Sequence, residues 1–181
     1  MPPAGATDTH FHIFGPGPGQ VRDPRAAYGP MDAPVEGLRA MHRAIGITHG
    51  VLVQNTAVQV NYDAFIAELG ANPNFAGVAV IDDRTTDAEL ARLHTAGVRG
   101  VRFHFVEFLK KRPPIDVFHR SVRRAAELGW HVVVHVEPSD LVELRETFAA
   151  IPTTLIIDHI AHLEPAFGVE QPAFQTLLEL H

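Results

Sequence analysis

Two histidines separated by one residue, His10 and His12, lie in the first β-rich segment of the chain, ATDTHFHIF at residues 6–14. Side chains of a strand alternate between its two faces, so we expect Asp8, His10 and His12 to share one face. Imidazoles at positions i and i+2 of a strand can bind a single metal ion through their ring nitrogens. The alternative is a structural or surface role for this pair, because histidine is common in mixed environments.

Another histidine, His135, ends the apolar segment HVVVHV at residues 131–136. Alternation puts His131, Val133 and His135 on one face, although three consecutive valines are typical of a strand that is buried on both faces. We interpret His131 as a core residue that lies deeper in the sheet. His135, at the carboxyl end of the strand, is the better candidate for chemistry.

Two more β-rich segments have titratable side chains near their carboxyl ends. GVRFHF at residues 100–105 puts Arg102 and His104 on one face, and TLIID ends in Asp158, which His159 follows. In a parallel barrel the carboxyl ends of all strands surround one cavity, where enzymes of this fold have their active sites. We expect His159 to face that cavity and Asp158 to point to the opposite face of its strand.

The segments that position these residues alternate between two kinds. Apolar β-rich runs are separated by segments with helical periodicity, which predicts an α/β fold with a parallel sheet covered by helices. The predicted strands span residues 6–14, 50–54, 76–82, 100–105, 130–136 and 154–158, and the predicted helices span 35–47, 62–73, 87–98, 117–129, 139–152 and 174–181.

A doubly wound sheet and a TIM (β/α)8-type barrel both fit this alternation. No Gly-rich phosphate loop follows the first strand, which weakens the dinucleotide-binding form of the doubly wound sheet. We therefore predict a single barrel domain over residues 1–181. A complete barrel usually needs about 250 residues, so we expect it to be truncated to about six βα units, without strands 7 and 8.

The composition excludes several classes of protein. The 181 residues have a net charge of −6 and contain no cysteine, which excludes a disulfide scaffold, a thiolate zinc site and a cysteine nucleophile. There is no basic stripe for nucleic acid, no signal-peptide pattern and no apolar stretch that could span a bilayer. We expect a cytoplasmic protein that acts on a small molecule, binds neither nucleic acid nor membrane, and can form a homo-oligomer.

The segments DTHFHIFGP, YGPMDA, VLVQ, AGVRGVRF, ELGWHVVV and IPTTLIIDH together resemble the amidohydrolase superfamily, in particular its branch of 2-pyrone-4,6-dicarboxylate lactonases. The resemblance implies a (β/α)8 barrel that hydrolyses a ring ester or a related bond in a small carboxylated compound. It implies catalytic roles for His159 and for Arg102, the latter by binding a substrate carboxylate. The further substrate-binding residues that we expect are Tyr28, Gln54, Asn55, Thr56 and His104.

The sequence also departs from that branch. The lactonases have a tyrosine in place of His135 and work without a metal, whereas metal-dependent members of the superfamily have a histidine there. We therefore predict a divalent metal, zinc, at His10, His12 and His135; the alternative is that His135 fills the space of the tyrosine and hydrogen-bonds the substrate. Phe108 and His162 fall where lactonases place further arginines, which argues against the same dicarboxylate substrate.

These residues predict a metal-dependent hydrolase of a small carboxylated lactone or related ring ester. The metal would polarise the scissile carbonyl or activate a water, and His159 would stabilise the oxyanion. A metal-dependent decarboxylase of the same superfamily and an inactive truncated chain or binding scaffold are the alternatives. The family's catalytic aspartate at the end of strand 8 has no counterpart here, which a shortened reading frame, a fragment or completion by a partner chain would explain.

Overall fold

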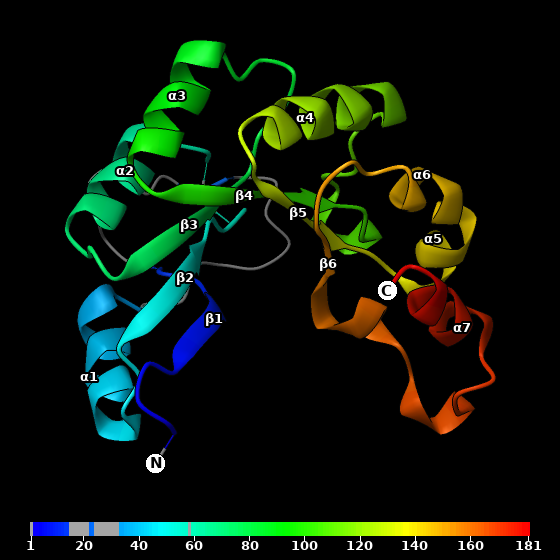
Figure 1. Cartoon of the computed structure of the whole chain (residues 1–181), viewed down its shortest axis with the longest axis horizontal. Coiled ribbons are helices and arrows are strands. Elements are labelled where there is room, and N and C mark those ends of the chain that lie inside the picture. The colour runs from blue at the N-terminus through cyan, green and yellow to red at the C-terminus, as the bar shows by residue number, and fades with distance from the viewer. Residues whose placement is uncertain (1, 15–21, 24–32, 58) are drawn as a thin grey trace. The chain divides into compact units, whose positions relative to one another are not determined.

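The computed structural model describes residues 2–14, 22–23, 33–57 and 59–181 (Figure 1). Strands and helices alternate along the chain, as the sequence predicts. The strands are β1 (Thr7–Phe11), β2 (His49–Val53), β3 (Phe75–Ala79), β4 (Val98–His104), β5 (His131–His135) and β6 (Leu155–Ile157). The α-helices are α1 (Val35–Ile45), α2 (Tyr62–Gly70), α3 (Asp87–Thr95), α4 (Ile115–Glu127), α5 (Pro138–Glu143), α6 (Arg145–Ala149) and α7 (Pro172–Glu179). Short 3-10 helices are η1 (Glu107–Leu109), η2 (Asp158–His162) and η3 (Pro165–Phe167).

The strands pair in chain order, β1-β2-β3-β4-β5-β6, in one six-stranded sheet. The pairings of β1 with β2, β2 with β3, β4 with β5, and β5 with β6 are parallel. A doubly wound sheet reverses its strand order at a switch point, whereas the sheet of a βα barrel keeps the chain order. The order therefore confirms the prediction of a barrel-type α/β fold with six βα units. Among the helices of the described residues, none has both the length and the apolar character that crossing a bilayer requires.

The chain divides into two compact units, each with its own core. The first consists of Met1–Val80 and Arg84–Arg99, and the second of Ile81–Asp83 and Gly100–His181. β4 begins in the first unit and continues into the second. Fully buried side chains include Val53, Val78 and Leu93 in the first unit and Val101, Phe118, Trp130, Val132 and Phe148 in the second.

Local sequence signals explain where several helices begin and end. α3 starts at a capping box, in which the Thr86 side chain accepts from the Glu89 backbone and the Glu89 side chain accepts from the Thr86 backbone. α1 ends at Gly46, whose φ of 79° is the left-handed conformation that glycine adopts without a steric penalty. The predicted helix over residues 139–152 is instead two short helices, α5 and α6, which meet at Leu144.

β1 contains a β-bulge that changes which side chains share a face. Asp8 pairs with Gly50 and Phe11 with Leu52, so β1 has one more residue than β2 between these two pairs. The extra residue puts Asp8 on the same side as Phe11, toward α1, where the Asp8 carboxylate lies 3.0 Å from Nε2 of His42. The prediction that Asp8 shares a face with His10 and His12 is therefore wrong, because the bulge interrupts the alternation.

In the second unit the alternation of side chains holds as predicted. Phe103 of β4 and the following Phe105 pack against Phe118 of α4, with ring centroids 4.9 and 5.3 Å apart. Arg102 and His104 consequently lie on the face of β4 that is turned away from α4.

Candidate functional site

In the first unit, the end of β1 is held against the end of β2 by two side-chain hydrogen bonds. Nδ1 of His12 lies 2.7 Å from the carbonyl oxygen of Val53. The amide nitrogen of Asn55 donates to the carbonyl oxygen of Ile13 over 3.0 Å. Since a carbonyl only accepts, Nδ1 of His12 has the proton, and Nε2 of the neutral ring then has the lone pair. This is the tautomer of a metal-binding histidine whose second nitrogen donates to a backbone carbonyl.

His10 and His12 remain neighbours despite the bulge, with ring centroids 5.1 Å apart and ring planes at 89° to one another. The structure therefore brings together the two histidines of the predicted metal-binding pair. Their role as metal ligands remains a prediction.

The predicted substrate-binding residues after β2 are buried and hydrogen-bonded to the backbone. Gln54 accepts from the backbone of Val80 over 3.0 Å, and Asn55 accepts from the backbone of Ala57 over 3.1 Å. Both amides therefore hold backbone segments in place, and Thr56 is buried beside them. Contact of these three residues with a substrate stays a prediction, and Tyr28 lies outside the described residues.

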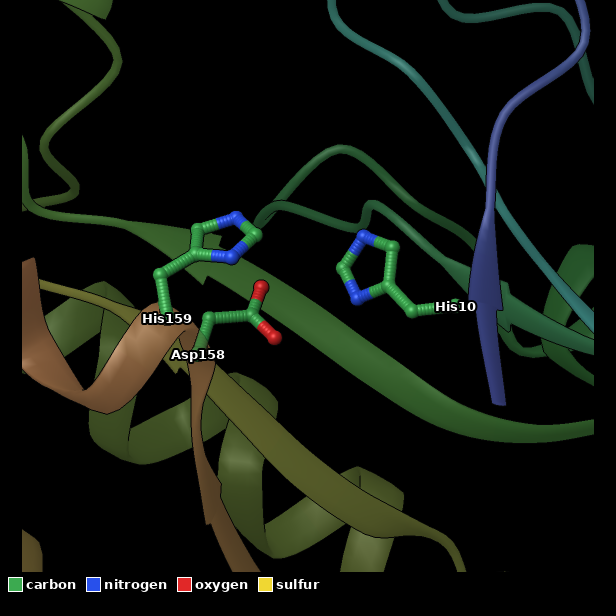
Figure 2. Close-up of side chains that lie close together, drawn as sticks. All are labelled: His10, Asp158 and His159. Atoms are coloured by element: carbon green, nitrogen blue, oxygen red, sulfur yellow. The ribbon is translucent and has the colours of Figure 1, made fainter. Parts of the chain in front are cut away.

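In the second unit, Arg102 and Asp158 form a buried ion pair. Nη2 of Arg102 lies 2.6 Å from Oδ2 of Asp158, and the two side chains are 4% and 6% exposed. The prediction that Asp158 points to the opposite face is wrong, because β6 ends at Ile157 and Asp158 already belongs to the turn that follows. Figure 2 shows Asp158 and His159 extending from this turn, and also draws His10 on β1 of the first unit.

Four imidazoles gather at the carboxyl ends of β4, β5 and β6 in the second unit: His104, His135, His159 and His162. We call them the imidazole cluster. Nδ1 of His135 lies 3.3 Å from Nδ1 of His104, and Nε2 of His135 lies 2.8 Å from Nε2 of His162. The ring centroids of His135 and His159 are 5.0 Å apart. His104 and His135 are buried, whereas His159 and His162 are exposed, so the cluster is accessible from solvent on one side.

The pKa of His135 is lowered from its ordinary value of 6.5 to about 3. Burial is the largest cause, the positive charge of Arg102 and the neighbouring His159 and His162 act in the same direction, and Asp158 opposes them. His135 is therefore neutral at physiological pH. A neutral imidazole is the form that binds a metal ion.

His159 and His162 belong to a left-handed turn in η2. The φ angles of His159, Ile160, Ala161 and His162 lie between 51° and 53°. For a residue other than glycine this conformation costs about 1–2 kcal/mol, and it is unusual in consecutive residues. The turn brings His162 against His135, a contact that reasoning from strand alternation missed. The signal available in the sequence was the spacing of the two histidines in DHIAH.

Comparison with known proteins shows the family to which the chain belongs. The family model described as Amidohydrolase matches residues 7–181. A 2-pyrone-4,6-dicarboxylate hydrolase of Comamonas testosteroni is 40% identical over 178 residues, which are 98% of this chain and 58% of that protein. A 4-sulfomuconolactone hydrolase of Rhizobium radiobacter is 33% identical over 180 residues, which are 98% of this chain and 60% of that protein.

Among solved structures, a probable 2-pyrone-4,6-dicarboxylic acid hydrolase from Acinetobacter baumannii with citric acid bound superposes with a TM-score of 0.82. It is 29% identical, and the match covers 97% of this chain and 66% of that one. This chain thus spans about three fifths of the length of the curated relatives that it matches. Because the family match extends over almost the whole sequence, the chain belongs to the amidohydrolase family.

Proposed function

We propose that the protein is a hydrolase that opens a small carboxylated lactone or a related ring ester. The observation that supports this most directly is the imidazole cluster around His135, in the unit that also contains the buried pair of Arg102 and Asp158. Two of the relatives that match this chain are themselves named as hydrolases of cyclic compounds.

We propose that His10, His12 and His135 hold a divalent metal, with zinc as the expected ion. The donor set fits, because three neutral imidazoles are a common set of zinc ligands in catalytic sites. His12 is fixed as the tautomer whose Nε2 has the lone pair, and His135 is kept neutral by burial. When bound, such an ion supplies Lewis-acid polarisation of a carbonyl and lowers the pKa of a water.

The other residues have roles that need no metal. Arg102 would bind a substrate carboxylate, held in its orientation by Asp158 at 2.6 Å. His159, exposed beside His135, would donate a hydrogen bond to the oxyanion that develops on the scissile carbonyl. We propose Tyr28, Gln54, Asn55, Thr56 and His104 as residues that line the substrate pocket.

The test is a panel of lactones that carry no, one or two carboxylates, assayed for ring opening with the purified 181-residue chain. Metal content is measured on the same samples, and His135→Ala is compared with His49→Ala. His49 is the matched control, because it is an exposed histidine at the amino end of β2. We expect wild type and His49→Ala to hydrolyse a lactone and to contain metal, and His135→Ala to lose both properties.

Two results would contradict this proposal in different ways. Full ring-opening activity in metal-free protein would contradict the proposed metal site but would leave the proposed hydrolase activity intact. Release of carbon dioxide without a ring-opened acid would replace the hydrolase by the decarboxylase alternative.

A further inference from the structure

We propose that His162 is an additional ligand of the divalent metal and binds it beside His135. This inference rests on the proposed metal site at His135. Both histidines lie in the second unit.

The distance between the two ring nitrogens suits this role. Nε2 of His135 and Nε2 of His162 are 2.8 Å apart. Two nitrogens that bind one zinc ion at 2.0–2.1 Å in tetrahedral geometry are about 3.3 Å apart. The two rings therefore need to separate by only about 0.5 Å to bind one ion together.

The surroundings of His135 turn the required nitrogen toward His162. Nδ1 of His135 is occupied by its contact with Nδ1 of His104 at 3.3 Å, so Nε2 is the atom that faces His162. A contact on the second nitrogen orients the ring of a metal-binding histidine. With the proton of His135 on Nδ1, Nε2 of His162 donates the hydrogen bond to Nε2 of His135. His162 would hold a metal through Nε2 as the neutral tautomer that has its proton on Nδ1.

The turn that contains His162 is strained, which is a second and independent observation. Four consecutive residues from His159 to His162 have φ values of 51–53°. Strained backbone persists only where the surrounding structure holds it, and it is concentrated at ligand-binding sites. Both histidines of the turn are exposed, whereas His135 beside them is buried. A bond from His162 to a metal would hold the turn in this conformation.

The experiment is a Co²⁺ titration of the purified chain, followed by the visible absorption of the bound ion and by calorimetry. The variants are His162→Ala, His162→Gln and His12→Ala, with His49→Ala as the matched control. Circular dichroism of each variant shows that it is folded, and His162→Gln keeps a polar side chain in case His162→Ala does not fold. We expect His49→Ala to bind Co²⁺ like the wild type. Both His162 variants should bind at least tenfold more weakly, with an altered absorption spectrum.

Each further outcome has a distinct meaning. Wild-type affinity and spectrum in a folded His162 variant, together with loss of binding in His12→Ala, would overturn this inference and leave the proposed metal site intact. Loss of binding in the His162 variants with full binding in His12→Ala would support it and remove His12 from the proposed ligand set. A wild-type chain that binds neither Co²⁺ nor Zn²⁺ would overturn both the role of His162 and the proposed metal site. If that chain still hydrolysed a lactone, the proposed hydrolase activity would stand.

Discussion

The Asp158 carboxylate lies 2.6 Å from the Arg102 guanidinium, and both groups are almost completely removed from solvent. Arg102 comes from β4 and Asp158 from the turn after β6, so their pairing connects two βα units of the second unit. The Asp158 carboxylate neutralises the same guanidinium that we propose to bind a carboxylate of the substrate.

Asp158→Asn should destabilise the protein strongly. The substitution keeps the shape of the side chain but leaves Arg102 as a buried charge without its counter-ion, which costs about 3–5 kcal/mol. Urea denaturation measures the change in the free energy of unfolding. The control is Asp116→Asn in the exposed pair of Asp116 with Arg120, where solvent screens the charges and we expect little or no loss of stability. Equal effects of the two substitutions would contradict the importance of burial.

The metal-free protein should lose stability as the pH falls below about 6.5. His135 has a pKa of about 3 in the folded state and an ordinary value of 6.5 when unfolded, because burial disfavours its charged form. Between these values the unfolded chain binds a proton that the folded chain does not, so acidification favours unfolding. Urea denaturation from pH 7.5 to pH 4 in the presence of a chelator, with His135→Phe for comparison, measures this contribution. We expect a shallower pH dependence in the variant, and identical slopes would show that His135 titrates normally.

Gly100→Ala should destabilise the second unit. A Cβ atom at this position would clash with the imidazole ring of His131, which covers Gly100 on the neighbouring strand. Such overpacking typically costs about 1–3 kcal/mol. Gly37→Ala in α1 is the opposite case, since no atom lies within 4 Å of its Cβ position and alanine favours the helix by about 0.5–1 kcal/mol. Thermal unfolding should therefore show a lower Tm for the first variant and a higher Tm for the second.

Ile160→Gly should stabilise the protein. Ile160 has a φ of 52° and is 62% exposed, so glycine would relieve strain and remove little packing. Relief of about 1–2 kcal/mol exceeds the roughly 0.5–1 kcal/mol of extra chain entropy that glycine brings to the unfolded state. Ile156→Gly in β6, where the side chain is 42% exposed but the backbone is extended, should lower the Tm instead. A lower Tm for Ile160→Gly as well would show that the turn is not strained.

Local sequence patterns predicted the elements well and the side-chain directions only in part. The alternation of apolar strands and amphipathic helices predicted all six strands of the described chain. Side chains on one face recur at every second residue of a strand and at about every 3.6 residues of a helix, so burial of one face leaves a recognisable pattern of apolar residues. The same rule correctly placed Arg102 and His104 on one face of β4. It failed at Asp8, where a bulge adds a residue, and at Asp158, where the strand has already ended.

The sequence alone determined the fold class, the family resemblance and the histidines worth considering, because these depend on residue types and on their spacing along the chain. Only the tertiary structure revealed that Asp158 pairs with Arg102 and that His162 contacts His135. The reason is physical: Asp158 reaches Arg102 because β6 ends one residue earlier, and His162 reaches His135 through the left-handed turn that follows. That turn is a high-energy backbone conformation that only the surrounding structure can hold.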